Sequence, residues 1–573
     1  MVKNNKLSIV FWVSLAIAGV FILWGVFLPG NVETVLGFID GFLANNFGWV
    51  YIIATTLFVL LALFLIFGPY GRIRLGKPDE RPEYSYFTWF AFLFTAGMGV
   101  GLVFFGISEP LTHYHNPPVV DPGTAAAFEE STRYTLFHWG FHPWATYAIV
   151  ALTLAYFKFR HQAPALISSA FTPLIGHRAQ GGLGHSIDVL AVFATIFGIA
   201  TSLGLGASQI TAGLSYTFDG ISNTTATTMI VIAVVTVIFI ISASTGVDRG
   251  IRYLSWMNIV VAIALMFFVF ILGSTVQMIE SLTTNLGTYI QNIPQMTLGM
   301  NAFEGDREFL NDWTLFYWAW WIGWSPFVGT FIARVSRGRT IREFVIGVTA
   351  VPVLFSAVWF SIFGVAGIEM DNALGGGLYE IVSEQGNEVA LFAFLEQYPW
   401  SPVIMGIAIL LISSFFITSA DAATFVLGML TTGGRLNPQV KIKVIWGVIL
   451  SATAAALLLS GGLQALEMAM LIAAFPFTFV VLFMAISLLK ALSGEYDILR
   501  LESKHKEYEP SFLKESKAEL KEKREEFEQG MPDELIDDTE ETYEETIEEE
   551  TNEEETNEEE TNEETNEETK DNK

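Results

Sequence analysis

The chain has 573 residues, of which 52% are hydrophobic, 14% aromatic and only 16% charged, and its net charge is −28. A soluble domain carries about 25% charged residues, so this composition excludes an ordinary water-soluble protein. The absence of cysteine excludes disulfides, iron–sulfur clusters, thiolate metal sites and cysteine nucleophiles. Residues 491–573 carry 10 Lys and Arg against 33 Asp and Glu, so −23 of the net charge lies in this last part of the chain.

Long apolar segments recur along the sequence, and most approach the ~20 residues that cross a hydrocarbon core of roughly 30 Å. They predict an all-α polytopic membrane protein with twelve transmembrane helices. The first segment is too long for a signal sequence and lacks a small-residue cleavage site, so we expect it to be retained. The predicted spans are 7–29, 48–68, 86–106, 137–158, 186–214, 227–245, 254–275, 312–333, 344–366, 401–430, 440–460 and 466–490.

Lys and Arg concentrate in alternate segments between these spans. The intervening loops carry only Arg133 and Arg307. By the positive-inside rule both termini are cytoplasmic, which requires an even number of spans in the cell membrane. The basic segments are the N-terminus and the stretches 72–81, 158–178, 249–252, 334–342 and 435–443.

Two of the spans contain helix-breaking residues. The third includes TAGMGVGL, with Gly97, Gly99 and Gly101, and each glycine weakens a helix by about 1 kcal/mol relative to alanine. The eighth includes WSPFVG, in which Pro326 removes a backbone donor. Small residues also allow close helix packing. Breaks in corresponding spans are nevertheless typical of inverted repeats, so spans 3–7 and 8–12 are predicted to form two inverted five-helix repeats.

This pattern divides the chain into five parts. The tail begins with a Glu- and Lys-rich stretch that could form a solvated helix, and its repeats beyond residue 533 cannot bury a core. The parts are two peripheral transmembrane helices (1–85), the first repeat (86–275), a connecting segment on the outer side (276–311), the second repeat (312–490) and an acidic, largely disordered cytoplasmic tail (491–573).

Aromatic side chains cluster in two spans. Residues 317–327 read YWAWWIGWSPF, and HWGFHPWATY in the fourth span places Trp139, Trp144 and Tyr147 within an arc of about 140°. An interfacial aromatic belt is the alternative explanation. A quaternary ammonium group has no hydrogen-bond donor, and aromatic faces attract it by about 0.5–2 kcal/mol each. The predicted spans 3, 4 and 8 contain no deep Asp or Glu, so we expect an aromatic cage for a methylated cation.

A zwitterionic ligand and a coupling ion need further groups. Backbone N–H groups at the break between Gly97 and Gly101, with the indole of Trp324, are expected to bind an anionic end. A sodium ion needs oxygen ligands, which Thr418 and Ser419 offer, although such hydroxyls often bond back to their own helix. Asp421 is the nearby carboxylate within a span.

Other classes of protein fit the sequence less well. A channel would show pore-lining polar rings and symmetry-related filter loops, which are absent. An enzyme needs a catalytic cluster, and the eight histidines show no HExxH motif or paired-ligand spacing around a carboxylate. We therefore expect neither an enzyme nor a cofactor or nucleic-acid partner.

Several strings resemble the betaine–carnitine–choline transporter family over roughly residues 8–495. The resemblance implies a fold like that of the sodium-coupled neurotransmitter and amino-acid symporters (the LeuT-like fold), a homotrimer and alternating access. The strings are GMGVGL (97–102), GISEP (106–110), HWGFHPWATY (138–147), FGIATSLGLGASQI (197–210), WAWWIGWSPFVGTFIARVSRGRTIREF (318–344) and TSAD (418–421).

The resemblance also implies residue roles. The substrate residues would be Trp139, Trp144, Tyr147 and Trp321 as an aromatic box, with Trp324 beside it and Gly97, Met98, Gly99 and Gly101 at the break. One sodium site would comprise Thr95, Met98, Phe415, Thr418 and Ser419, and a second would include Thr195 and Phe327. Ile199 replaces an expected threonine at the second site, which leaves one or two ions open. The implied function is sodium-coupled import of a compatible solute for osmoprotection, most directly glycine betaine. Ectoine, choline, carnitine and a sodium-independent exchanger are the alternatives.

Overall fold

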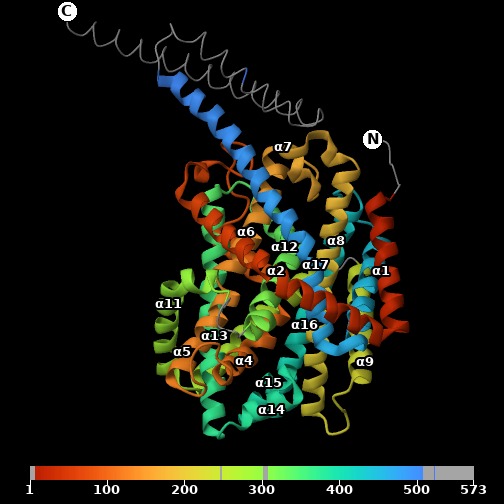
Figure 1. Ribbon diagram of the computed structural model, residues 1–573, viewed down its shortest axis with the longest axis vertical. Coiled ribbons are helices and arrows are strands. Elements are labelled where there is room, and N and C mark those ends of the chain that lie inside the picture. The colour runs from red at the N-terminus through yellow and green to blue at the C-terminus, as the bar shows by residue number, and fades with distance from the viewer. Residues whose placement is uncertain (1–6, 98, 246–247, 301–306, 508–521, 523–573) are drawn as a thin grey trace, which may run out of the picture.

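The computed structural model describes residues 7–97, 99–245, 248–300, 307–507 and 522, and these contain helices but no β-strand (Figure 1). The helices of the first half are α1 (Ile9–Phe27), α2 (Pro29–Phe67), α3 (Tyr86–Gly97), α4 (Val100–His115), α5 (Ala125–Trp139), α6 (Phe141–Ala155), α7 (Thr172–Ile175), α8 (Gly182–Thr217), α9 (Thr225–Thr245) and α10 (Asp248–Leu272). Those of the second half are α11 (Thr275–Leu298), α12 (Phe316–Arg334), α13 (Ile341–Ala373), α14 (Gly377–Gln385), α15 (Ala390–Glu396), α16 (Ser401–Thr431) and α17 (Val440–Glu507).

Eight helices in the described part of the chain are long and apolar enough to cross a membrane. One of them, α17, joins two predicted spans across a kink at Gly461 and Gly462, where the backbone leaves helical geometry. Every predicted span overlaps one or two of the helices named above, but the number twelve and the inverted repeats stay predictions. The structure adds α11, a long helix that the sequence analysis treated as a connecting segment.

The predicted break in the third span is present. Helix α3 ends at Gly97 and α4 begins at Val100, with Gly99 in an extended conformation between them. The predicted break at Pro326 is wrong, because α12 continues through it to Arg334. Proline removes the donor that would bond the carbonyl of Ile322, and the Ser325 hydroxyl donates to that carbonyl instead, over 2.7 Å. The helix therefore keeps its hydrogen bonds in spite of the proline.

Helix starts are capped by local polar contacts. Thr340 and Glu343 form a reciprocal capping box at the start of α13. The Thr124 hydroxyl accepts a hydrogen bond from the backbone N–H of Ala127 at the start of α5. These caps fix where α13 and α5 begin, and α5 leads directly into the candidate site.

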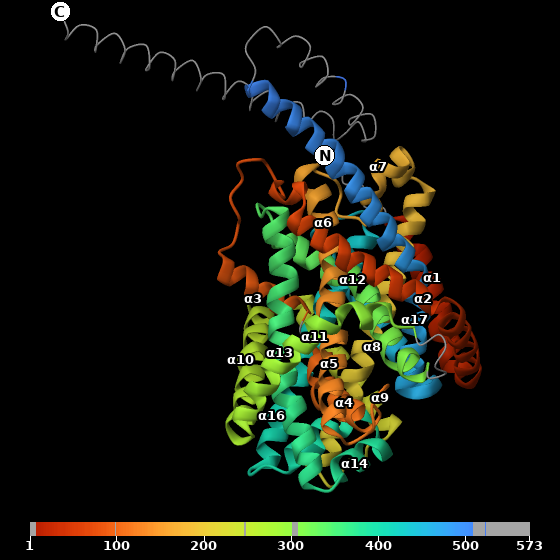
Figure 2. The same ribbon diagram turned by 60° about the vertical axis from the view of Figure 1, so that its left-hand side comes forward.

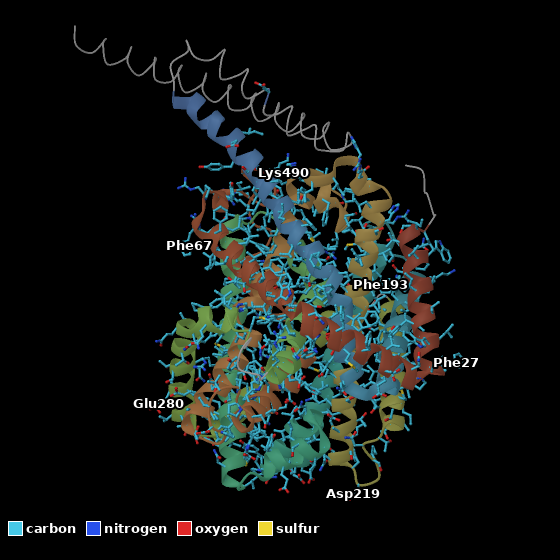
Figure 3. The ribbon with its side chains drawn as sticks, viewed as in Figure 1. Phe27, Phe67, Phe193, Asp219, Glu280 and Lys490 are labelled. Carbon is cyan, nitrogen blue, oxygen red and sulfur yellow. The ribbon has the colours of Figure 1, made fainter. Side chains whose placement is uncertain are left out.

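Helix α1 begins and α17 ends at the same end of the molecule, opposite α14, as two views show (Figures 1 and 2). Figure 3 places Phe67 and Lys490 toward this end and Asp219 at the other. Basic loops meet here: Arg337 lies 2.5 Å from Glu80, and Arg74 donates to the carbonyl of Gly338. Two of the basic segments, 72–81 and 334–342, therefore contact each other in the fold.

Helix α17 continues beyond residue 490, where the sequence analysis placed the start of the tail. Glu495 is 3% exposed and lies 2.6 Å from Arg160, and Tyr156 donates to its other oxygen. These residues belong to the packed part of the molecule. The acidic repeats beyond residue 533 lie outside the described residues.

Candidate functional site

The four predicted box residues form a continuous line of ring contacts between α5, α6 and α12. Trp139 meets Trp321 at a centroid distance of 4.9 Å, and Trp321 meets Tyr147 at 6.2 Å. Tyr147 in turn meets Trp144 at 5.5 Å, and all three contacts are edge-to-face. Each of the four side chains is at most 5% exposed. The structure therefore brings together the residues that the sequence predicted as a cage, in a closed arrangement.

The remaining tryptophans of α12 have separate roles. Trp320 stacks on Trp321 with centroids 4.9 Å apart and planes within 12°. Trp318 stacks on His142 instead of on a box residue. The Trp324 indole donates to the carbonyl of Gly198 on α8 over 2.8 Å. The prediction that this indole is available to an anionic ligand end is therefore wrong for the described conformation.

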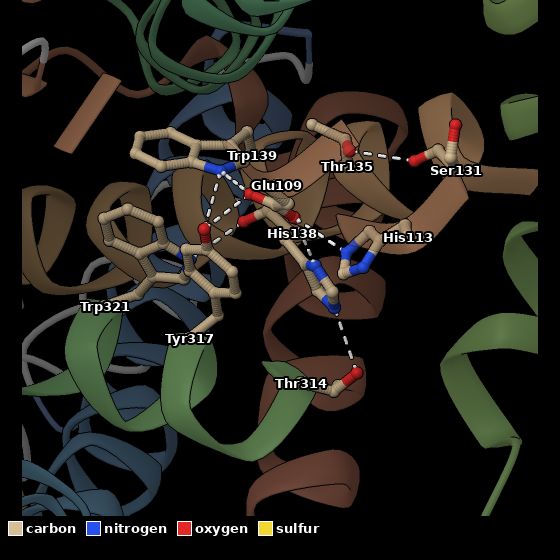
Figure 4. Close-up of polar contacts among 9 residues, drawn as sticks. All are labelled: Glu109, His113, Ser131, Thr135, His138, Trp139, Thr314, Tyr317 and Trp321. Carbon is tan, nitrogen blue, oxygen red and sulfur yellow. Dashed lines mark hydrogen bonds and ion pairs between the residues drawn. The ribbon is translucent and has the colours of Figure 1, made fainter. Parts of the chain in front are cut away.

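Both indole N–H groups at the centre of the cage bond to protein atoms behind the rings. Trp139 Nε1 donates to Glu109 Oε2 over 2.8 Å, and Trp321 Nε1 donates to the carbonyl of His138 over 2.9 Å (Figure 4). With their donors used, these two side chains have only their π faces left for a ligand. Such faces suit a cation that carries no hydrogen-bond donor.

Glu109 lies beside the cage although the predicted spans 3, 4 and 8 contain no deep acid. It is on α4 and fully buried, three residues beyond the predicted end of the third span. Its neighbours contradict the expectation that no histidine is spaced for pairing with a carboxylate. His113 Nε2 lies 3.3 Å and His138 Nδ1 2.7 Å from Glu109 Oε1. Glu109 is part of the motif GISEP (106–110), so the sequence contained a motif that could have pointed to this residue.

Glu109, His113 and His138 place their ligand-type atoms within 4.8 Å of one another. Two ligands of a tetrahedral zinc ion, bound at about 2.0–2.2 Å, would stand roughly 3.3 Å apart. The 2.7 Å contact between Glu109 and His138 is shorter, and it has the length of a hydrogen bond. His138 Nε2 also pairs with the Thr314 hydroxyl at 3.0 Å. The geometry is that of a hydrogen-bonded network.

Two glycines allow the helices to approach the aromatic rings. A Cβ atom at Gly101 would lie 2.5 Å from the Trp320 ring and 3.0 Å from Trp139. At Gly99 it would lie 3.6 Å from Trp324 and 3.8 Å from the Ser419 hydroxyl, which are ordinary contacts. The break before α4 therefore meets the aromatic group of α12 and the hydroxyl of α16.

The predicted sodium ligands are only partly described. Phe415, Thr418 and Ser419 lie on α16, and the Thr418 hydroxyl bonds back to the carbonyls of Ser414 and Phe415. Asn258 Nδ2 on α10 lies 3.4 Å from the Thr418 hydroxyl. Asp421 follows on α16 and is half-buried. Met98 lies outside the described residues, as does the side chain of Thr95, so this ligand set stays a prediction.

The second predicted sodium site involves α8 and α12, which contact each other. The Thr195 hydroxyl donates to the carbonyl of Ala191 over 2.7 Å, and Phe327 is 6% exposed. Ile199 is fully buried on α8 and offers no oxygen in its side chain. No observation assigns an ion to these residues.

Comparison with known proteins adds to this geometry. Residues 9–497 match the family described as BCCT, betaine/carnitine/choline family transporter. The chain belongs to this family. Its members are transporters rather than enzymes, and with several membrane-length apolar helices this chain is a multi-pass membrane protein.

The chain is 50% identical over 493 residues to the glycine betaine transporter OpuD of Bacillus subtilis (strain 168), covering 86% of this chain and 95% of the relative. It is 45% identical to a probable glycine betaine transporter of Desulfitobacterium hafniense (strain Y51), covering 86% and 99%. An ectoine/hydroxyectoine transporter of Virgibacillus pantothenticus is 40% identical, covering 86% and 98%. The family is therefore established by nearly full-length similarity.

Proposed function

We propose that the chain is a sodium-coupled importer of glycine betaine, which serves as a compatible solute in osmoprotection. The observation that carries the proposal is the line of contacts through Trp139, Trp321, Tyr147 and Trp144. The indole donors of the two central tryptophans are bonded away from the cage, which suits a trimethylammonium group. The two relatives named as glycine betaine transporters, at 50% and 45% identity, support the same substrate.

The proposed mechanism is alternating access in a LeuT-like arrangement of two inverted repeats. A trimethylammonium group does not fit between rings in direct edge contact, so binding requires the closed cage to open. The Gly99 break lies in contact distance of Trp324 and of the Ser419 hydroxyl, which would link substrate binding on α12 to ion binding on α16. A homotrimer in the cell membrane with both termini cytoplasmic completes the proposal.

Sodium coupling is proposed for the site around Thr418 and Ser419, because sodium prefers oxygen ligands and an interrupted helix, such as that between α3 and α4, can offer backbone carbonyls to an ion. Each positive charge that enters at −100 mV contributes about 2.3 kcal/mol, or roughly 50-fold in accumulation. One sodium ion therefore suffices for concentrative uptake. We propose that two sodium ions are coupled, with a backbone carbonyl or a water molecule replacing the hydroxyl that Ile199 lacks. If the wild type couples only one sodium ion, Ile199→Thr should raise the number of sodium ions transported per betaine.

A second candidate substrate is ectoine, because a relative named as an ectoine/hydroxyectoine transporter is 40% identical over nearly its whole length. Ectoine carries a delocalised cation with N–H donors, whereas the quaternary ammonium group of betaine has no N–H donor. Both cage indoles already donate to protein atoms, and among the described cage residues only the Tyr147 hydroxyl is left to accept from a ligand, so the cage favours the ligand without donors. This comparison places betaine ahead of ectoine.

The deciding experiment is uptake of labelled betaine, ectoine, choline and carnitine into proteoliposomes that contain the purified protein. We expect betaine to accumulate fastest and unlabelled betaine to compete with every other substrate. Efficient uptake of ectoine with no uptake of betaine would overturn the substrate assignment. Liposomes without protein supply the background.

A further inference from the structure

Glu109 is a fully buried acidic side chain on α4, and its hydrogen bonds reach residues of α5 and α12 that belong to the cage or stand next to it. Its Oε2 accepts hydrogen bonds from Trp139 Nε1 at 2.8 Å and from the Tyr317 hydroxyl at 2.5 Å. Its Oε1 pairs with His138 Nδ1 at 2.7 Å. An indole N–H can only donate, so the carboxyl group acts as an acceptor toward the cage.

The same carboxyl group supports two walls of the cage. It bonds Trp139 directly, and the Tyr317 ring that it holds stacks on Trp321 with centroids 5.7 Å apart and planes within 22°. His138, which it also holds, accepts the Trp321 indole on its backbone carbonyl. Figure 4 shows Glu109 with Trp139 and Tyr317 on one side and the two histidines, His138 and His113, on the other. Movement of Glu109 would therefore displace both rings.

A negative charge on Glu109 would act on the cage through the hydrogen bond from the Trp139 indole. Among the described residues the only basic side chains beside Glu109 are His113 and His138, with no Lys or Arg within pairing distance. A carboxylate that accepts from an indole N–H pushes electron density into the ring, and the low polarity of the site strengthens this effect. A more electron-rich ring face attracts a cation more strongly. Burying an acid is costly unless its oxygens are hydrogen-bonded, and those of Glu109 bond to Trp139, Tyr317 and His138.

We propose that Glu109 is a positioning and specificity-determining residue: its carboxylate holds Trp139 and Tyr317 in place and supplies the negative charge that makes the cage prefer a quaternary ammonium group to a neutral group of the same shape. The inference rests on the proposed function, since it concerns the same cage. It adds the physical basis on which the cage distinguishes a charged headgroup from an uncharged one.

The test compares glycine betaine with 3,3-dimethylbutanoate, in which carbon replaces the ammonium nitrogen. Dissociation constants for both ligands are measured on the purified full-length protein by tryptophan fluorescence. In Glu109→Gln, which keeps the shape and removes the charge, we expect the preference for betaine over the isostere to fall by about tenfold, the equivalent of one strong cation–π contact. Equal loss of affinity for both ligands, with the preference unchanged, would show a merely structural role and overturn the proposal.

Asp371→Asn is the matched control. Asp371 is also a buried acid that pairs with a histidine of α4, His115, at 2.7 Å, but its other oxygen accepts from the backbone of Tyr379 and not from a cage ring. The preference for betaine should be unchanged in this variant. A loss as large as that in Glu109→Gln would overturn the proposal, because the effect would then not depend on contact with the cage.

Trp139→Phe provides an independent measurement should Glu109→Gln fail to fold. It keeps an aromatic face and the carboxylate but removes the N–H that joins them, so the preference should fall by a smaller factor than in Glu109→Gln. An unchanged preference would overturn the proposal. Failure of wild-type protein to bind betaine at all would instead refute the proposed function, so the two failures are distinguishable.

Discussion

The ring of Trp139 meets the ring of Trp321 edge to face, with centroids 4.9 Å apart and planes at 71°. The two residues come from helices separated by about 180 positions in the sequence. Neither tryptophan can move its indole without breaking a hydrogen bond to Glu109 or to the His138 carbonyl. This contact therefore fixes the relative positions of α5 and α12 at the cage.

Loss of one cage wall should weaken substrate binding. We expect Trp321→Leu or Trp144→Leu to lower betaine affinity at least about tenfold, or ~1.4 kcal/mol, because each ring contributes a cation–π contact. Tyr147→Phe should be milder, since the ring remains and the Tyr147 hydroxyl has no hydrogen-bond partner among the described residues. Binding is measured by isothermal titration. Trp49→Leu, at an exposed tryptophan, is the control, and wild-type affinity in Trp321→Leu would refute the cage.

The two glycines near the cage should respond differently to alanine. Gly101→Ala would place a methyl group 2.5 Å from the Trp320 ring, so the rings must shift and betaine affinity should fall by about tenfold. Gly99→Ala adds a methyl group at ordinary contact distances and should change affinity by less than about threefold. The dissociation constants of the two variants, measured side by side, check this order. The reverse order would contradict the described packing.

Ion binding should depend on the hydroxyls of α16. Thr418→Ala combined with Ser419→Ala removes two oxygens from a site that must replace the water around sodium. We expect the half-saturating sodium concentration for betaine uptake to rise at least about tenfold, the equivalent of ~1.4 kcal/mol, while membrane abundance stays near wild type. Ser413→Ala, on the same helix but turned away, is the control. An unchanged sodium dependence in the double variant would remove these residues from the ion site.

The continuity of α12 through Pro326 should depend on Ser325. Ser325→Ala leaves the buried carbonyl of Ile322 without its partner, which should cost about 1–3 kcal/mol of stability. Pro326→Ala restores a backbone N–H for this carbonyl, so Ser325→Ala should cost little in that background. Thermal unfolding of the detergent-solubilised variants completes the double-mutant cycle. Equal costs in both backgrounds would show that the Ser325 hydroxyl does not replace the missing donor.

The sequence predicted the parts of the site that depend on residue type and spacing. Tryptophans concentrated in two predicted spans indicated that Trp139, Trp144 and Trp321 would gather, and three glycines in five positions indicated the break between Gly97 and Val100. The family resemblance selected Trp321 from its neighbours. These features are local in the chain, so no tertiary information was needed.

Other features depended on contacts that spacing does not reveal. The prediction of a break at Pro326 was wrong because the adjacent Ser325 hydroxyl satisfies the carbonyl that proline leaves open. Glu109 was missed because the apolar run was ended at residue 106, although α4 continues to His115. Its pairing with His138 joins α4 to α5, and the sequence pattern of neither helix predicts this contact. Trp324 was expected to face a ligand, whereas its indole bonds to Gly198 of α8.

The most direct test of sodium-coupled betaine transport is the current carried by proteoliposomes on a solid-supported membrane. Betaine is zwitterionic and adds no net charge, so any substrate-dependent current reports the coupled ion. We predict an inward positive current only when betaine and sodium are present together, and none when potassium replaces sodium. Betaine uptake of equal rate and extent in sodium and in potassium, without current, would contradict the account.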